Sequence, residues 1–311
     1  ADKIENDKSA ELIFNQSPFY AESGGQVSDT GLISNENFEA KIEKVRKISG
    51  LIVHKIIVNK GKIYNGDLVE LVVDANIRKS IAANHSATHL MHQALKDVVG
   101  VQVNQRGSLN DSERLRFDFS SNKPISTNDI QKVEQIVNKH ILEDTIVDTR
   151  VMDLEEAKKI GAQALFGEKY ENEVRVVLMG FNSVWDAKSS SLRERFSMEL
   201  CGGTHVHRTG MIGSFIIKSE MASSSGVRRI EALTGMNAIK YLQLNRLYID
   251  QITSILKIPI DAVDKRLNSL LTEKKTLTQK IDQLKKSKPT NSDIGHHNNI
   301  KIINGISFVV N

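Results

Sequence analysis

The sequence predicts an α+β protein with three parts: a small N-terminal β-barrel-like unit, an α+β domain, and an antiparallel helical hairpin of the coiled-coil type. In the first part, apolar residues alternate between glycine-rich turns, as in short strands. Helix and strand patterns then mix without the regular alternation of a doubly wound sheet, and a heptad-like repeat comes after them. With 40% hydrophobic and 26% charged residues in 311 positions, the chain can bury a sizeable core.

The first part, residues 1–75, is expected to form a compact barrel or meander of short strands. Turn residues such as Gly50 and Asn65-Gly66-Asp67 separate its apolar alternations. One stretch, residues 18–26, ends in Gly24-Gly25-Gln26. Paired glycines let the backbone approach a ligand closely, although a tight turn is the favoured explanation from these residues alone.

The second part, residues 76–235, begins with a predicted helix from about Asn76 to Val99. Asp74 is its expected N-cap and Gly100 its stop signal. The further elements expected are strands over 101–109 and 115–119, a helix capped by Thr127 and ending near 143, a strand over 146–152, a short helix capped by Asp153 and ending at 161, and strands over 174–179, 196–201, 212–217 and 226–233.

Two short motifs in this part place metal-ligand residue types four positions apart. His85 and His89 share one face of the first helix, and Cys201 and His205 come after a predicted strand. Together they offer three imidazoles and a thiolate, a donor set that suits zinc. Core histidines and a buried structural thiol are the alternatives. His92, one turn further along, is either another ligand or a supporting partner.

The third part, residues 236–289, is read as two helices that meet near Ile258-Pro259, because proline disfavours helix in the residue before it. The second helix carries apolar residues at spacings of three and four, which predicts a coiled-coil seam. Eleven basic and five acidic residues lie between 236 and 289. This excess could meet nucleic-acid phosphates or form a solvated face. Residues 290–311 are expected to be a linker and the start of a truncated C-terminal domain.

The ends and the hydropathy of the chain also carry information. The sequence begins at Ala1, has no signal-peptide pattern, and nowhere has eighteen consecutive apolar residues. We therefore expect a cytoplasmic protein without a membrane partner, supplied as a fragment.

Seven motifs, taken in order, resemble the editing region of bacterial alanyl-tRNA synthetases. They lie at residues 19–26, 84–90, 105–109, 115–119, 164–170, 199–206 and 226–232. The resemblance covers about residues 10–235. The helical arm with the start of a further domain resembles the segment on the C-terminal side of the editing region in that family. Nothing in the chain resembles the class II aminoacylation core.

This resemblance implies a function. It implies one zinc ion at His85, His89, Cys201 and His205, and hydrolysis of tRNA(Ala) mischarged with serine or glycine. It also associates the positions of Thr88, Gln105 and Ser108 with the editing pocket, where helix packing and a polar strand face are the alternatives. Arg228 is a candidate for tRNA backbone contact or pocket structure, with a surface ion pair as its alternative.

The intact parent is expected to attach alanine to tRNA(Ala) with ATP and magnesium in a part missing from this chain. Oligomerisation is possible through the missing C-terminal part. Two other interpretations stay open at this point. One is a free-standing trans-editing deacylase, and the other is a non-catalytic tRNA-binding module that zinc stabilises.

Editing chemistry explains why a second site is needed. A synthetic site that admits alanine cannot exclude glycine by size and rejects serine poorly. Zinc can polarise the ester carbonyl, hold the amino group or activate water, and the sequence does not choose among these roles. Four protein ligands normally close a zinc site. Ser86 is the residue after the first histidine, so the motif lacks the glutamate base of an HExxH protease.

Overall fold

The computed structural model describes residues 3–4, 9–164, 171–180, 196–287, 300–304 and 306–309. The motif expected at 164–170 lies outside these ranges except for its first residue. Residues 290–299, the first part of the segment expected to be a linker and the start of a further domain, also lie outside them. The chain forms two units, Ala1–Leu242 and Gln243–Asn311, each described here by itself.

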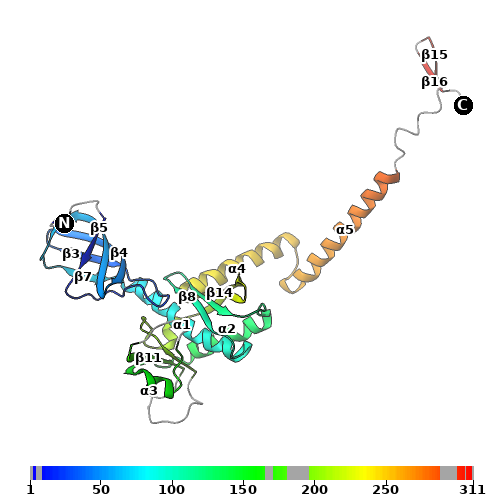
Figure 1. The fold of residues 1–311 in the computed structure, drawn as a ribbon. Helices are drawn as coiled ribbons and strands as arrows, with labels where there is room; N and C mark the ends of the chain where they lie inside the picture. The colour runs from blue at the N-terminus through cyan, green and yellow to red at the C-terminus, as the bar shows by residue number, and fades with distance from the viewer. Residues whose placement is uncertain are drawn as a thin grey trace. The chain divides into compact units, whose positions relative to one another are not determined.

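The N-terminal part is a five-stranded antiparallel sheet with its own core (Figure 1). Buried and exposed residues alternate along its central strand, because successive side chains point to opposite faces. This confirms the predicted β unit. The strand order is β2 (Ser9–Ile13), β5 (Leu51–Gly61), β4 (Phe38–Ile48), β3 (Gly31–Asn35) and β7 (Glu70–Val73), and a separate pair joins β1 (Lys3–Ile4) to β6 (Ile63–Tyr64).

Helix α1 (Ala75–Val99) is the central element of the α+β part. The Asp74 side chain accepts hydrogen bonds from the backbone nitrogens of Asn76 and Ile77, both at 3.0 Å, and Gly100 ends the helix, as predicted. Almost every residue from Ile81 to Leu95 is buried. A helix buried all round must have protein on every side. Its polar residues therefore need partners within the fold.

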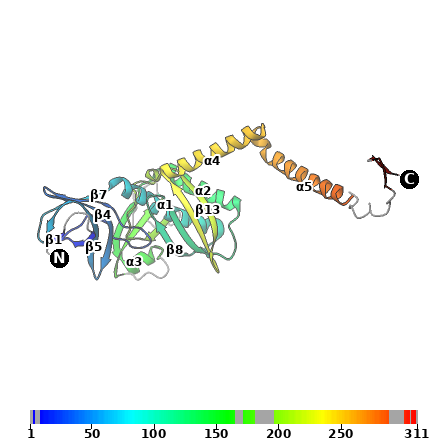
Figure 2. The same cartoon turned by 90° about the horizontal axis from the view of Figure 1, so that it is seen from above.

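A four-stranded antiparallel sheet packs against α1 and α2 (Thr127–Leu142), as Figure 1 and Figure 2 show. Its large core includes Leu90, Leu95, Phe117 and Phe119. The strand order is β13 (Phe215–Ser224), β14 (Val227–Thr234), β9 (Leu115–Ser120) and β8 (Gln105–Asn110).

Several predicted boundaries in this region were wrong. The strand expected from 146 begins at Asp148, and the short helix expected to end at 161 ends at Lys159. The N-cap of α2 is Ser126, whose Oγ accepts from the Asp129 nitrogen at 3.1 Å, so Thr127 is already helical. Strand β8 begins at Gln105, since residues 101–104 form a turn after Gly100. Strand β13 begins three residues after Ile212, which lies in the 3-10 helix η2 (Thr209–Ile212).

A smaller three-stranded antiparallel sheet carries the second metal motif. Its order is β10 (Asp148–Asp153), β11 (Glu173–Met179) and β12 (Ser197–Leu200), and α3 (Leu154–Lys159), capped by Asp153 as predicted, packs on β10 and β11. Strand β12 lies against α1 and ends directly before Cys201. This contact brings the two motifs of the sequence to one place.

The C-terminal part contains the predicted helices, α4 (Gly235–Leu256) and α5 (Val263–Ser287), with η3 (Ile260–Ala262) between them and a hairpin of β15 (Ile300–Ile303) and β16 (Ile306–Val309) after them. Apolar residues of the predicted α5 seam such as Leu277 and Leu284 are exposed. The antiparallel pairing of the two helices therefore stays a prediction. Within the described ranges, no helix combines the length and the apolarity needed to cross a bilayer.

Candidate metal centre

The structure brings the two metal motifs together. His85 and His89 lie one turn apart on α1, while Cys201 and His205 lie in the turn after β12. One potential ligand atom from each of the four residues lies within 4.8 Å of all the others. The four residues can therefore hold one metal ion.

Distances at the centre fit a small tetrahedral ion. The Sγ atom of Cys201 lies 3.4 Å from Nε2 of His85 and 3.3 Å from Nε2 of His205. A tetrahedral ion with metal-ligand bonds of 2.0–2.3 Å separates nitrogen and sulfur ligands by about 3.5 Å. The ring centroids of His85 and His205 lie 4.4 Å apart. The donors are thus already near the separations that a bound ion needs.

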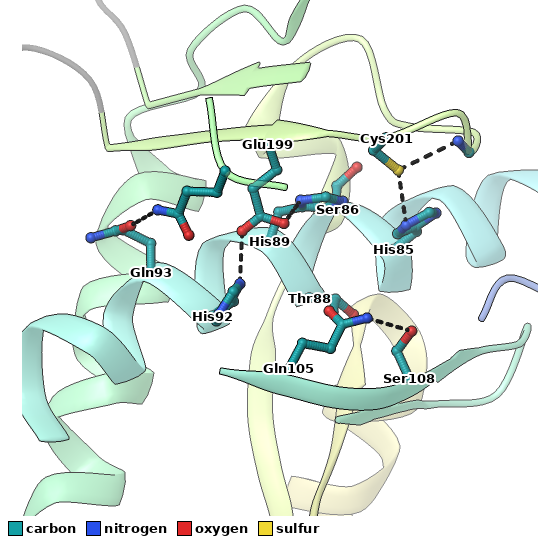
Figure 3. A network of polar contacts seen from close by, with 12 residues as sticks. His85, Ser86, Thr88, His89, His92, Gln93, Gln105, Ser108, Glu199 and Cys201 are labelled. Atoms are coloured by element: carbon teal, nitrogen blue, oxygen red, sulfur yellow. Dashed lines mark hydrogen bonds and ion pairs between the residues drawn. The ribbon is translucent and has the colours of Figure 1, made fainter. Parts of the chain in front are cut away.

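Each histidine has its outer nitrogen, Nδ1, beside a polar group of the protein. The partners are Gln26 Oε1 at 2.7 Å for His85, Glu199 Oε2 at 2.5 Å for His89, and Ser86 Oγ at 3.1 Å for His205. Metal-binding histidines commonly have such partners, which fix the ring orientation and tautomer. Figure 3 shows His89 and its carboxylate partner directed toward each other. The surroundings of the four residues therefore also fit a metal site.

Glu199 is the charged centre of a wider buried network. Its Oε1 lies 2.9 Å from Nδ1 of His92, and both side chains are almost fully buried. Burial raises the pKa of Glu199, but His89 and His92 lower it more, so the carboxyl group stays ionised well below its ordinary range. His92 therefore supports Glu199, and it lies outside the four-residue ligand cluster.

Electrostatics favour the ligand form of the thiol. Burial raises the pKa of Cys201, but His85 and His205 outweigh it, and the pKa lies well below its ordinary value. Burial and the nearby His85 lower the pKa of His205 to about 3. Burial lowers the pKa of His89, yet Glu199 overrides it and raises that pKa to about 10. Thiolate sulfur and neutral imidazole are the forms that bind metal ions. Cys201 and His205 therefore favour the ligand form, whereas His89, a cation beside Glu199, must release a proton when an ion binds.

The three predicted pocket residues lie on α1 and β8. The buried hydroxyl of Thr88 contacts the Asn84 carbonyl at 2.9 Å and Asn110 Oδ1 at 2.7 Å. Gln105 Nε2 donates to Ser108 Oγ at 3.4 Å, and Figure 3 shows both of these side chains directed from the strand toward α1. Ser108 Oγ also donates to the Gly24 carbonyl at 3.4 Å. The bonds of Thr88 are thus short, whereas those of Gln105 and Ser108 are long.

Arg228 lies on β14, opposite Phe119 of β9. Its guanidinium forms two hydrogen bonds of 2.5 Å with the carboxylate of Glu220, and only 16% of its side chain is exposed. The neighbouring Arg229 pairs in the same way with Asp118, at 2.7 and 2.8 Å. Arg228 is therefore engaged in a largely buried ion pair, and its role at the tRNA or the pocket stays a prediction.

Sequence reasoning missed three residues of the centre: Gln26, Ser86 and Glu199. A signal existed for Glu199, because residues two apart in a strand point to the same face and Cys201 directly continues β12. Gln26 lies in the glycine-rich stretch, whose sequence indicates only a close backbone approach. Nothing local indicates that its side chain reaches His85.

Two known protein families match segments of the chain that contribute residues to the metal centre. Residues 1–77 match the family of class II (A) tRNA synthetases, and residues 174–231 match the second additional domain of threonyl and alanyl tRNA synthetases. The second match contains Cys201 and His205. The first match falls on the β unit. We expected no resemblance to the class II aminoacylation core in this chain.

Similar proteins include three alanine-tRNA ligases. The chain is 48% identical to the protein of Dinoroseobacter shibae, with 88% of this chain and 31% of the relative aligned. It is 44% identical to the protein of a Ruegeria species, with 99% of this chain and 34% of the relative aligned. It is 45% identical to the protein of Ruegeria pomeroyi, with 92% of this chain and 32% of the relative aligned. The chain thus spans about a third of the length of the curated relatives it matches.

Proposed function

Because this chain is homologous to one segment of the alanine-tRNA ligases, we propose that it is their editing part. In this proposal it hydrolyses tRNA(Ala) that carries serine or glycine, at a centre that holds one zinc ion. The observation that carries the proposal is the gathering of His85, His89, Cys201 and His205, with ligand atoms within 4.8 Å. The complete protein is proposed to attach alanine to tRNA(Ala) with ATP and magnesium, in the cytoplasm.

Zinc is the proposed ion because the donor set combines imidazole nitrogens with a thiolate. When bound, it would supply a Lewis acid for the ester carbonyl or for water. The protein contributes the geometry. Gln26, Ser86 and Glu199 contact the outer nitrogens of the three histidines, so the inner nitrogens would be left to hold the ion.

Selection of serine is proposed to involve Gln105 and Ser108. Their mutual hydrogen bond is 3.4 Å long, so both polar groups keep the capacity to bond a substrate hydroxyl. The Thr88 hydroxyl is already bonded to Asn84 and Asn110, so we propose that Thr88 shapes the pocket without touching the substrate. We also propose that Arg228 maintains the sheet near the tRNA through its pair with Glu220.

The deciding experiment is a deacylation assay with the full chain. tRNA(Ala) is charged in turn with serine, glycine and alanine, and release of the amino acid is followed over time. We expect fast release of serine and glycine and little release of alanine, with Cys201→Ala as the inactive control. Absence of selective release from protein that binds zinc would favour the non-catalytic tRNA-binding module.

The free-standing deacylase is distinguished by the natural reading frame. A frame that continues upstream of Ala1 into a class II core would exclude it. A short frame with full serine release would instead support it.

A further inference from the structure

Gln26 is a buried side chain of the β unit that reaches the metal centre. It is 0% exposed, although it lies in a loop. Its Oε1 accepts a hydrogen bond from the Thr204 backbone nitrogen at 2.8 Å and lies 2.7 Å from His85 Nδ1, while its Nε2 donates to Thr204 Oγ1 at 2.8 Å. One amide therefore joins the two segments that carry the ligands.

These contacts fix the tautomer of His85. A backbone nitrogen can only donate a hydrogen bond, so the atom that faces Thr204 N must be the amide oxygen of Gln26. That same oxygen faces His85 Nδ1, so Nδ1 must carry a proton. In the neutral ring the lone pair is then on Nε2, which is the nitrogen 3.4 Å from Cys201 Sγ.

The loop is held in place by close backbone contacts. The Asn110 nitrogen donates to the Gly25 carbonyl at 2.7 Å, and the Val27 nitrogen donates to the Asn110 carbonyl at 3.1 Å. A Cβ atom on Gly203 would lie 2.5 Å from His85 Nδ1 and 2.7 Å from Gln26 Oε1. A side chain at position 203 would therefore overlap both groups. Glycine at this position lets the Gln26 amide approach the His85 ring.

We propose that Gln26 is a positioning residue through which the N-terminal β unit orients His85 for metal binding. This inference rests on the proposed metal site. It means that the β unit supplies part of the metal centre, although all four ligands belong to the α+β part. Because supporting partners of this kind typically change metal affinity 10- to 100-fold, loss of the amide should weaken zinc binding by about that factor.

The test compares four full-length proteins: the natural sequence, Gln26→Met, Gln26→Glu and the control Gln16→Met. Methionine keeps the length of the side chain but removes its hydrogen bonds. Glutamate keeps an oxygen for His85 and Thr204, and the Thr204 hydroxyl can turn to donate to its second oxygen. Gln16 is exposed in the same unit. Zinc affinity is measured by chelator competition, and the ligand field by the absorption spectrum of the cobalt-substituted protein.

We expect Gln26→Met to bind zinc about 10- to 100-fold more weakly and to alter the cobalt spectrum. Gln26→Glu should restore both properties, and Gln16→Met should leave both unchanged. If Gln26→Met only lowers the melting temperature while affinity and spectrum stay unchanged, Gln26 is a structural tie and the inference is overturned. If the natural sequence itself binds no zinc, the proposed function fails at its metal site.

Discussion

The Sγ atom of Cys201 lies 3.4 Å from Nε2 of His85, although 116 residues separate them in the chain. The contact is made where the end of β12 meets α1. It predicts that Cys201→Ala loses zinc and serine release together, because three imidazoles without the thiolate bind zinc less tightly. Bound zinc per chain, measured by metal analysis, checks this. Unchanged zinc content would remove Cys201 from the ligand set.

Removal of the metal should destabilise the first unit. An ion present at about 1,000 times its dissociation constant adds about 4 kcal/mol to the folded state. For a unit of this size, that corresponds to roughly 8–16 °C in melting temperature. Thermal unfolding with and without a chelator measures the shift. Cys201→Ala should show little response to the chelator, and an equal response in both proteins would contradict a thiolate-containing site.

His54 makes the stability of the β unit sensitive to acid. Its Nε2 lies 2.7 Å from Ser17 Oγ, its ring contacts Phe14 and Phe19, and burial lowers its pKa below the ordinary 6.5. The unfolded chain therefore binds a proton more readily than the folded one. The contribution of the neutral ring is fully present above about pH 6.5 and is lost as the pH falls toward the folded value.

His54→Gln lacks this titration, so its unfolding free energy should fall less than that of the natural sequence between pH 7.5 and pH 5. Urea unfolding at both pH values measures the difference. Equal losses in the two proteins would show that His54 is not the sensitive group.

Two glycines with similar backbone angles should respond differently to alanine. Gly25 has φ +82° and Gly50 has φ +86°, but a Cβ on Gly25 would lie 2.7 Å from the Ser108 carbonyl oxygen, whereas one on Gly50 meets nothing within 4 Å. Gly50→Ala should cost about 1–2 kcal/mol from the left-handed backbone alone. Gly25→Ala should cost about 1–3 kcal/mol more from overlap, and it should weaken zinc binding because Gln26 is the next residue.

Denaturant unfolding and chelator competition on the two variants separate these effects. Zinc affinity should be unchanged in Gly50→Ala. If Gly25→Ala matches Gly50→Ala in both measurements, the contact between the glycine loop and β8 has no role at the metal centre.

Much of the α+β fold could be predicted from the sequence, and so could the gathering of the four donor residues, because the signals are local. A capping aspartate, an apolar stripe and a glycine delimit α1, and the helical period places His85 and His89 on one face. The meeting of the two motifs was predicted from donor chemistry and from the family resemblance.

The supporting residues could not be predicted, because their contacts are made between distant segments. Gln26 meets Thr204 across 178 positions, and no local pattern encodes that distance. Boundaries failed for a related reason. Ile212 is apolar and looks like part of a strand, but Gly213 adopts φ +75° and ends η2 before β13 begins.

The burial of α1 has a consequence for the order in which the molecule is completed. The helix is finished by residue 99, but its inner face packs on strands that end as late as residue 234. At roughly 5–20 residues per second, synthesis of this stretch lasts several seconds or more. During that time α1 can pack on β8, β9 and α2, but its contacts with β12 and β14 are still missing. The proposed metal centre would thus be among the last features of a nascent chain to mature. Its candidate ligands are far apart in the sequence, which gives the site a high contact order.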